Sequence, residues 1–337
     1  MNEITFFSSP IGLGHATRDI AIAQYLDKMS IKFISGEGAS KLFLEYGFYI
    51  EDVYHPPSFV INHGKLQNSL RWLFKYYSYY KECKAIASSV IEKEKPNLIV
   101  SDEDFASLTI GQEKNLKSVL ITDVLETKFV SGIGSLIEKK MNRSMKKIIQ
   151  KCDLVIIPEN GPNEGNITRV GPIVRRTLQT RDELRKRFSF NKKTIVVSIG
   201  GTNAGKFLID KVVEAFKKLK LDVELVIVSG PSLKIDIDRI QNLGFINNLH
   251  EVVYAADLII SLAGKSTIDE SKQYGTPGIF IPIKGHFEQE ENAKNEGFSF
   301  DDLFRLESLI SEKINEKQIP VNFDGAQKAA NLIKELL

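Results

Sequence analysis

Short apolar runs that are rich in β-branched residues alternate with helical patterns along the whole chain. The strand candidates are Ile4–Ser9, Ile31–Ser35, Leu98–Ser101, Val119–Thr122, Leu154–Ile157, Thr194–Ser198, Val223–Ser229, Leu258–Leu262 and Gly278–Pro282. Alternation of strands and helices is typical of parallel sheets that are covered by helices on both faces. The pattern therefore predicts an α/β protein.

A Gly-Pro pair in the segment Arg169–Arg176 ends the first alternating series, and a charged stretch separates it from the second. We expect two doubly wound, Rossmann-like domains that face a cleft, residues 1–172 and residues 173–337. The last helix of the chain is free to pack back on the first domain. Ligands of such sheets bind beyond the carboxyl ends of the strands, so glycine-rich turns at these ends are the first places to search.

Composition excludes several classes of protein. The 45 basic and 43 acidic residues give a net charge of +2, which provides no overall attraction to nucleic acid. Cys83 and Cys152 match no metal or redox spacing and suit a reducing compartment. The first residues do not resemble a signal peptide, and no apolar run reaches the ~18 residues of a membrane span. We therefore expect a cytoplasmic protein, with contact to the inner face of the membrane left open.

The first glycine-rich turn lies in the stretch Ser8–Leu26 and reads "GLGHATRD". A dinucleotide fingerprint requires a third small residue where this chain has Thr17, which disfavours NAD. His15 is expected at a helix N-terminus, where the helix dipole favours a neutral imidazole that can act as a general base. A histidine that only hydrogen-bonds the loop is the alternative.

Two further turns resemble parts of a P-loop without completing it. "IGGTNAGKF" (Ile199–Phe207) has Phe207 where a magnesium-binding hydroxyl is required. "LAGKSTIDES" (Leu262–Ser271) ends like a P-loop but lacks the earlier glycine. ATP hydrolysis is therefore disfavoured. Glycines at the start of a helix suit a diphosphate, and we expect both turns to face the same cleft.

From about Lys193 to Phe298 the chain resembles the C-terminal domain of the MurG-type UDP-N-acetylglucosamine transferases, which have the GT-B fold. The similar segments, in order, are "SIGGTNAG", "GFINNLHEVVYAADLIIS", "AGKSTIDESKQYGTP" and "KGHFEQEENA". The resemblance implies a metal-independent hexosyltransferase that takes a UDP-sugar as its substrate and needs no cofactor. The donor-binding residues it implies are Gly14, Gly200, Gly201, Thr202, Phe245, Ile246, Ala263, Gly264, Lys265, Ser266, Thr267, Glu270, His286 and Gln289.

Individual roles follow from the same resemblance. Backbone groups at Phe245 and Ile246 read uracil, Glu270 binds the ribose hydroxyls, and Gln289 contacts the donor sugar. A carboxylate and an amide are chemically suited to hydroxyl groups. Solvated helix residues are the alternative for Glu270 and Gln289.

The N-terminal half departs from the family, because "GLGHATRD" stands where those enzymes have "GGTGGH". The pattern G-x-G-H-x-x-R in this stretch also resembles the UDP-sugar hydrolases of the pseudaminic-acid pathway. The whole chain resembles uncharacterised archaeal-type transferases. The sequence thus predicts a glycosyltransferase that moves a hexose, N-acetylglucosamine first of all, to an acceptor hydroxyl. A UDP-sugar hydrolase, a non-catalytic UDP-sugar-binding subunit and a nucleotide-sugar epimerase are the alternatives.

Acidic residues follow two strand candidates of the first half. "SDEDFASL" places Asp102, Glu103 and Asp104 at a strand end, and Asp123 follows the next strand. One of them could deprotonate or orient the acceptor, and Asp102 is preferred as a catalytic residue because it is nearest the strand end. The alternative is an N-cap cluster, since acids favour the first turn of a helix.

Two predicted helices combine features of membrane-surface segments. "SLRWLFKYYSYYKECK" (Ser69–Lys84) mixes aromatic and basic residues, and "EKKMNRSMKKIIQK" (Glu138–Lys151) carries six Lys or Arg against one Glu. Such helices suit a peripheral contact with a membrane that carries a lipid-linked acceptor, a glycan being the other acceptor considered. Helices packed on the domain with a solvated charged face are the alternative.

Overall fold

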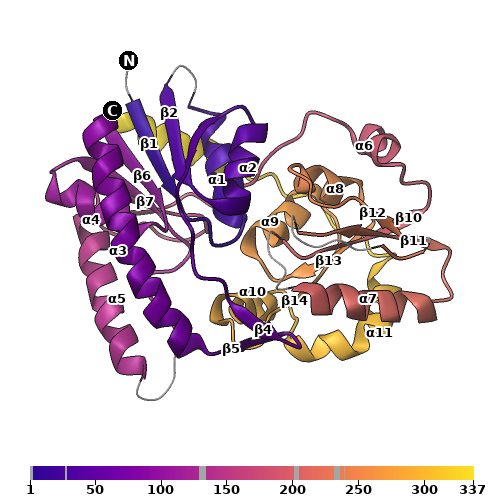
Figure 1. Ribbon diagram of the computed structural model, residues 1–337. Helices are drawn as coiled ribbons and strands as arrows, with labels where there is room; N and C mark the ends of the chain where they lie inside the picture. The colour runs from indigo at the N-terminus through magenta and orange to yellow at the C-terminus, as the bar shows by residue number, and fades with distance from the viewer. Residues whose placement is uncertain (1–2, 27–28, 129–133, 201–204, 231–235, 239) are drawn as a thin grey trace. The chain divides into compact units, whose positions relative to one another are not determined.

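The computed structural model describes residues 3–26, 29–128, 134–200, 205–230, 236–238 and 240–337. Its contacts divide the chain into two compact units (Figure 1). Unit 1 comprises Met1–Ser58, Asn68–Val174 and Phe323–Leu337, and unit 2 comprises Phe59–Gln67 and Arg175–Asn322. The predicted division after residue 172 lies two residues before the end of the middle segment of unit 1, at Val174. Residues 59–67 differ from the prediction because they belong to unit 2, whereas the last helix belongs to unit 1, the place that the prediction left open for it.

Unit 1 is a doubly wound α/β sandwich. Its elements are β1 (Glu3–Ser8), α1 (Gly14–Ala23), β2 (Ser30–Ser35), α2 (Glu37–Glu45), β3 (Tyr49–Asp52), α3 (Ser69–Glu94), β6 (Leu98–Asp102), α4 (Phe105–Glu113), β7 (Lys117–Ile121), α5 (Gly134–Lys151), β8 (Leu154–Ile157), β9 (Ile167–Arg169) and α12 (Gly325–Glu335). The sheet order is β3-β2-β1-β6-β7-β8-β9, and every pairing is parallel. The strand order therefore reverses between β1 and β6, which is the switch point where such sheets bind ligands.

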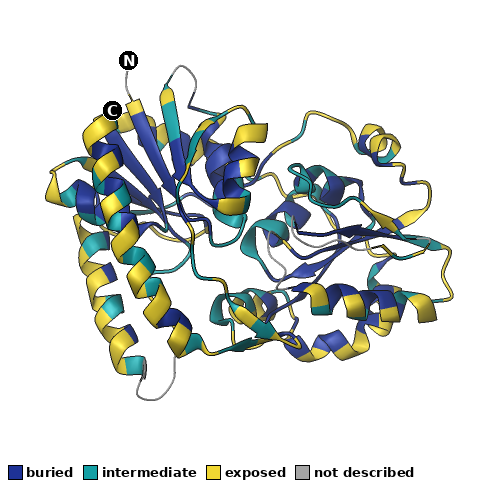
Figure 2. Cartoon of the chain, viewed as in Figure 1, coloured by how far each residue is buried: buried dark blue, intermediate teal, exposed yellow. Residues whose placement is uncertain are grey.

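Consecutive residues of the central strands enter opposite cores, as expected for strands buried on both faces. Phe6 and Val100 pack with residues of α1, α2 and α12 in one cluster. Phe7 and Ile99 pack with residues of α3 and α4 in another. The central strands β1 and β6 are accordingly buried along nearly their whole length, while the covering helices expose one side (Figure 2).

Unit 2 repeats this plan. Its elements are β4 (Val60–Asn62), β5 (Lys65–Gln67), α6 (Arg181–Phe188), β10 (Lys193–Ser198), α7 (Lys206–Lys218), β11 (Val223–Val228), β12 (Gln241–Asn242), α8 (Leu249–Ala255), β13 (Leu258–Leu262), α9 (Lys265–Tyr274), β14 (Gly278–Ile281), α10 (Phe287–Asn295), the 3-10 helix η2 (Phe300–Arg305) and α11 (Leu306–Lys313). A parallel sheet has the order β12-β11-β10-β13-β14, so its switch point lies between β10 and β13. The predicted parallel doubly wound sheets are thus confirmed in both units.

The antiparallel hairpin β4–β5 comes from the first half of the sequence but belongs to unit 2. The Leu66 N–H donates to the Lys284 carbonyl (2.9 Å), and the Lys284 N–H donates to the Gly64 carbonyl (2.8 Å). A Cβ atom at Gly64 would come within 2.8 Å of the rings of Phe207 and Phe300. Glycine at this position therefore allows the hairpin to lie directly on the core of unit 2.

Candidate active site

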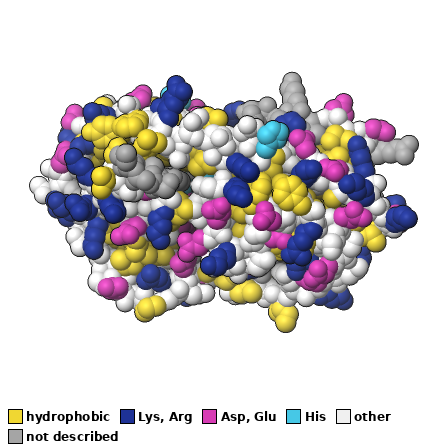
Figure 3. Space-filling model, turned by 90° about the horizontal axis from the view of Figure 1, so that it is seen from below, with side chains coloured by type: hydrophobic (Ala, Val, Ile, Leu, Met, Phe, Trp, Pro, Cys, Tyr) yellow, Lys and Arg dark blue, Asp and Glu magenta, His cyan; other side chains and the backbone are white. Residues whose placement is uncertain are grey.

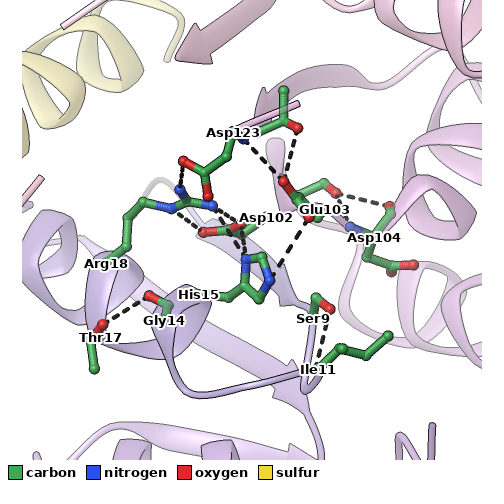
Figure 4. Close-up of polar contacts among 12 residues, drawn as sticks. Ser9, Ile11, Gly14, His15, Thr17, Arg18, Asp102, Glu103, Asp104 and Asp123 are labelled. Carbon is green, nitrogen blue, oxygen red and sulfur yellow. Dashed lines mark hydrogen bonds and ion pairs between the residues drawn. The ribbon is translucent and has the colours of Figure 1, made fainter. Parts of the chain in front are cut away.

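The switch point of unit 1 brings His15 and Asp102 together (Figure 4). His15 stands in the first turn of α1, directly after β1, and Asp102 is the last residue of the neighbouring strand β6. Ser8 of β1 pairs with Asp102 in the parallel register, which fixes the two strand ends side by side. His15 Nδ1 lies 2.8 Å from Asp102 Oδ1. The two residues predicted to be catalytic are therefore in direct contact.

Arg18 completes this cluster, and the sequence predictions did not include it. Its guanidinium donates to both Asp102 oxygens, from Nε to Oδ2 (2.8 Å) and from Nη2 to Oδ1 (2.5 Å). Its Nη1 donates to Asp123 Oδ1 (2.7 Å). A paired fork of this kind fixes the carboxylate plane. The spacing of three residues from His15 was the available signal, because it places both side chains on one face of α1.

The contacts determine which imidazole nitrogen holds a proton. The Asp102 carboxylate only accepts hydrogen bonds, so Nδ1 of His15 must be the donor, and Nε2 is the nitrogen that gains or loses a proton when the imidazole titrates. Arg18 Nη2 approaches Nδ1 at 3.3 Å, but two donors do not form a hydrogen bond. A buried carboxylate on one imidazole nitrogen, which leaves the other nitrogen to exchange a proton, is the arrangement found in histidine general bases.

The expectation that the helix N-terminus keeps His15 neutral is wrong. Burial does lower the pKa of the imidazole, but the charge and hydrogen bond of Asp102, helped by Glu103, outweigh burial and raise the pKa to about 9. Burial also opposes the charge of Asp102, yet Arg18 and His15 hold the pKa of its carboxyl below the ordinary value. The pair therefore exists as an imidazolium and a carboxylate at neutral pH.

Glu103 lies on the other side of the imidazole. Its Oε2 is 3.8 Å from His15 Nε2, whereas its Oε1 accepts hydrogen bonds from Thr122 Oγ1 and the Asp123 N–H, both at 3.0 Å. Burial, assisted by the Asp123 charge, raises the pKa of Glu103. Glu103 and Asp123 thus belong to the His15 cluster, and their role on the acceptor side stays a prediction.

Asp104 has a different place. It is the N-cap of α4, and its carboxylate accepts from the Ala106 and Ser107 N–H groups and from the Tyr54 hydroxyl, the last at 2.8 Å. The alternative interpretation as an N-cap therefore holds for Asp104, and its oxygens are engaged away from His15.

Asp19 is a second residue that the sequence predictions omitted. It is completely buried on α1, and neither carboxyl oxygen has a hydrogen-bond partner among the described residues. Burial, reinforced by the Asp102 charge, raises the pKa of Asp19 well above the ordinary value. The raised pKa favours the protonated, uncharged form of Asp19.

In unit 2, three predicted donor-binding turns follow adjacent strands. The register pairs Ser198 of β10 with Ser261 of β13, and Leu262 of β13 with Ile281 of β14. Because these strands are parallel, the turns that follow them lie next to one another at the carboxyl ends of the strands. Several predicted donor-binding residues lie in these turns or at the start of α9: Gly200, Ala263, Gly264, Lys265, Ser266, Thr267 and His286. Gly201 and Thr202 lie outside the described residues.

The turn between β13 and α9 contains Gly264, which has no neighbouring atoms where a side chain would begin. Gly264 is the N-cap of α9, and a Cβ atom placed on it would meet nothing within 4 Å. The side chain of Asn292 in α10 donates to the Ala263 carbonyl (3.2 Å), which ties this turn to the segment after β14. The first amides of α9 carry the partial positive charge of a helix N-terminus, which suits an anion.

The remaining predicted donor-binding residues differ in their contacts and burial. Lys265 forms an ion pair with Asp269 (2.6 Å). Gln289 accepts from the Ile283 N–H (3.0 Å), which orients its amide. Burial lowers the pKa of His286 to about 4, so its imidazole is neutral. Phe245 and Ile246 are half-buried in the loop before α8. Gly14 belongs to unit 1, where its carbonyl accepts from Thr17 Oγ1 (2.8 Å).

Glu270 is 2% exposed, so the alternative of a solvated helix residue is wrong. It lies on the buried face of α9, where Arg175 Nη2 donates to its Oε1 (2.9 Å). Burial raises the pKa of Glu270, and the Arg175 charge opposes that increase.

Comparison with known proteins supports the resemblance. Residues 194–299 match the glycosyltransferase family 28 C-terminal domain. An uncharacterised glycosyltransferase of Methanopyrus kandleri is 26% identical over 61% of this chain and 62% of its own length. The UDP-N-acetylglucosamine–N-acetylmuramyl-(pentapeptide) pyrophosphoryl-undecaprenol N-acetylglucosamine transferase of Staphylococcus saprophyticus is 26% identical over 82% of this chain and 79% of its own.

Among solved structures, the glycosyltransferase of kitacinnamycin superposes with a TM-score of 0.70 over 99% of both chains, at 14% identity. This likeness concerns the fold, and it confirms the predicted GT-B architecture. The predicted resemblance to the MurG-type transferases is confirmed as well.

Proposed function

We propose that this chain, a glycosyltransferase with the GT-B fold, transfers a hexose from a UDP-sugar to an acceptor hydroxyl, and that N-acetylglucosamine is the first sugar to test. The contact between His15 and Asp102 at the switch point of unit 1 is the observation that carries the proposal. A glycosyl transfer needs a base for the acceptor, and this pair is built as one.

Unit 1 supplies the acceptor chemistry in this proposal. Nε2 of His15, once deprotonated, takes the proton of the acceptor hydroxyl while the acceptor oxygen forms its bond to the anomeric carbon of the sugar. Asp102 stabilises the resulting imidazolium, and Arg18 fixes Asp102. The Glu103 carboxyl, 3.8 Å from Nε2, is positioned to orient the incoming hydroxyl.

Unit 2 supplies the donor site. The bond between the anomeric carbon and the diphosphate breaks, and the diphosphate leaves with the bonding electrons. The amides at the start of α9 stabilise its charge, so the proposal requires no metal ion. Glu270 binds the ribose, and the backbone at Phe245 and Ile246 reads the base.

Calorimetric titration with UDP, thymidine diphosphate, ADP and GDP tests the donor site. We expect UDP to bind best and Glu270→Gln to weaken its binding. Binding of ADP without UDP would overturn the donor assignment. For the chemistry, His15→Gln should keep UDP affinity and lose turnover of UDP-N-acetylglucosamine, whereas His55→Gln, at an exposed histidine, should change neither.

Product analysis separates the alternatives. Transfer yields UDP and a glycosylated acceptor, whereas free sugar released without an acceptor would assign hydrolysis. Conversion of the donor without UDP release would assign epimerisation. Binding of UDP without any turnover, with lipid acceptors present, would assign a non-catalytic subunit.

We further propose that unit 1 docks on an anionic membrane, which would deliver a lipid-linked acceptor. The patch consists of Leu70, Phe74 and Tyr77 on α3, and Leu136 and Ile137 on α5, all between 40% and 67% exposed. The α3 members recur at helical spacing, so they share one face. In Figure 3, hydrophobic side chains lie among Lys and Arg side chains on the face of unit 1 seen from below.

Some aromatic residues of α3 are buried and others are exposed. Trp72 is buried, and its Nε1 donates to the Pro57 carbonyl (2.8 Å), so it belongs to the packed side of the helix. On α5, all six basic residues of the predicted basic helix are exposed: Lys139, Lys140, Arg143, Lys146, Lys147 and Lys151. Basic side chains beside apolar ones suit an interfacial helix, and no described helix is both long and apolar enough to span the bilayer.

Co-sedimentation with vesicles tests this contact. The chain should bind vesicles that contain phosphatidylglycerol and should bind phosphatidylcholine vesicles far less. Phe74→Ser should reduce binding, whereas Leu178→Ser, at an exposed leucine of unit 2, should not. Equal binding by wild type and Phe74→Ser would remove the patch from the proposal.

A further inference from the structure

Arg175 is the first residue of unit 2 after the chain leaves unit 1, and its side chain is only 3% exposed. Nε and Nη2 donate to Oε1 of Glu270, at 3.3 and 2.9 Å. Nη1 donates to the carbonyl of Asn247, at 2.6 Å. One guanidinium therefore contacts both α9 and the loop that precedes α8.

In the proposed donor site, these two contacts belong to parts that bind the same nucleoside. Glu270 is the residue assigned to the ribose, and Asn247 directly follows the Phe245–Ile246 pair that is assigned to the base. A planar guanidinium with donors in a fixed fork sets the relative position of its partners more closely than a flexible ammonium does. Arg175 is thus placed to align the sugar-binding and base-binding parts of one nucleoside site.

The backbone of Arg175 and its neighbour Thr177 also form hydrogen bonds with α9 and with α8 itself. The Tyr274 hydroxyl of α9 donates to the Arg175 carbonyl (3.1 Å) and accepts from the Thr177 N–H (3.2 Å). Thr177 Oγ1 donates to Glu251 of α8 (2.8 Å). The segment 175–177 therefore holds α8 and α9 from both its side chains and its backbone.

We propose that Arg175 is a positioning residue of the nucleotide site, which holds the Glu270 carboxylate charged and oriented for the ribose hydroxyls. This inference rests on the proposed function. Burial alone favours a protonated Glu270, and the Arg175 charge opposes this. Without Arg175, the buried carboxyl would take up a proton or turn away, since a buried unpaired charge is unfavourable.

The test compares UDP with 2′-deoxy-UDP by calorimetry on the full chain. In the wild type, loss of the 2′-hydroxyl should weaken binding about tenfold or more, the range for a hydrogen bond to a charged group. In Arg175→Lys and Arg175→Gln, we expect this preference to fall to about threefold or less. Arg176→Gln is the matched control, because the neighbouring Arg176 is exposed and its Nη2 donates to Asn322.

The outcomes separate the two proposals. A wild type that binds no UDP would refute the donor site itself. A wild type that binds UDP but does not distinguish the deoxynucleotide would overturn the role of Glu270 and with it that of Arg175. Retention of the tenfold preference in Arg175→Lys would overturn the positioning role even if UDP affinity fell. Circular dichroism identifies a variant that fails to fold, and if Arg175→Gln fails, Arg175→Lys decides.

Discussion

Replacing Asp102 by asparagine should lower the pKa of the His15 imidazole from about 9 to 6.5 or below. The wild-type value exceeds the ordinary value of 6.5 by about 2.5 units, which corresponds to about 3 kcal/mol in favour of the imidazolium. This is the net result after burial has lowered the pKa, so Asp102 contributes more than the difference. Glu103 remains in the variant and offsets part of the loss.

An NMR titration of the histidine side chains measures this change. The chain has five histidines, and burial lowers the pKa of two of them, His250 and His286, so their signals are distinct from one that titrates near pH 9. A His15→Gln sample identifies the His15 signal by its disappearance. Asp104→Asn is the control, because Asp104 caps α4 and makes no contact with the imidazole in the described structure.

Two results would refute the reasoning. A wild-type His15 that titrates below pH 7 would show that Asp102 does not hold the imidazolium. A His15 pKa that stays near 9 in Asp102→Asn would transfer the effect to another group. The stability of the fold provides a second readout, because the folded pKa lies above the unfolded one. The stabilisation from a charged His15 should be complete below about pH 6.5 and lost as pH rises through about 9.

Three further predictions follow from the described contacts. If His15 is the base, kcat/KM for transfer should rise about tenfold per pH unit below its pKa and level off above about pH 9; a flat profile from pH 6 to 9 would contradict a basic role. Asp19→Asn should gain stability relative to the wild type as pH rises from about 4 to 7, by up to ~1.4 kcal/mol per unit in urea unfolding, because the raised pKa of buried Asp19 makes the wild type lose stability there; a constant difference would contradict a neutral Asp19. Gly64→Ala should lower the free energy of unfolding by about 1–3 kcal/mol more than Gly297→Ala, since both have a positive φ but only the first places a methyl group against two aromatic rings; equal losses would contradict the hairpin contact.

The fold was largely predictable because its central strands are buried on both faces and therefore appear as continuous apolar runs. The predicted runs Leu98–Ser101 and Thr194–Ser198 differ from β6 and β10 by a single residue at one end. The hairpin β4–β5 was not predicted, because its strands have three residues each and carry polar side chains. Its place in unit 2 depends on tertiary contacts with Lys284, which no local pattern encodes.

The candidate site was predictable to the extent that its residues follow strands. Asp102 ends β6, Asp123 closely follows β7, and His15 lies in the first turn of the helix that follows β1, all at the strand ends where parallel sheets place ligands. Arg18 and Asp19 lie further along α1, and Arg175 lies in a segment that was interpreted only as a domain join. Their importance depends on what they contact, so they appear only once the strand order is known.

The charge of His15 gives a physical reason why the sequence alone could not predict the whole site. The sequence reveals the helix N-terminus beside His15, and a helix dipole contributes about 0.3–1 kcal/mol, up to ~2 in buried geometry. The carboxylate that opposes it comes from Asp102, 87 positions away, and the net preference for the charged form is about 3 kcal/mol. The larger effect thus came from the residue that only the pairing of β1 with β6 brings near. In a parallel sheet the two strands at the switch point are distant in sequence by construction, so the protonation state of a residue there must be derived from strand order before local helix effects are considered.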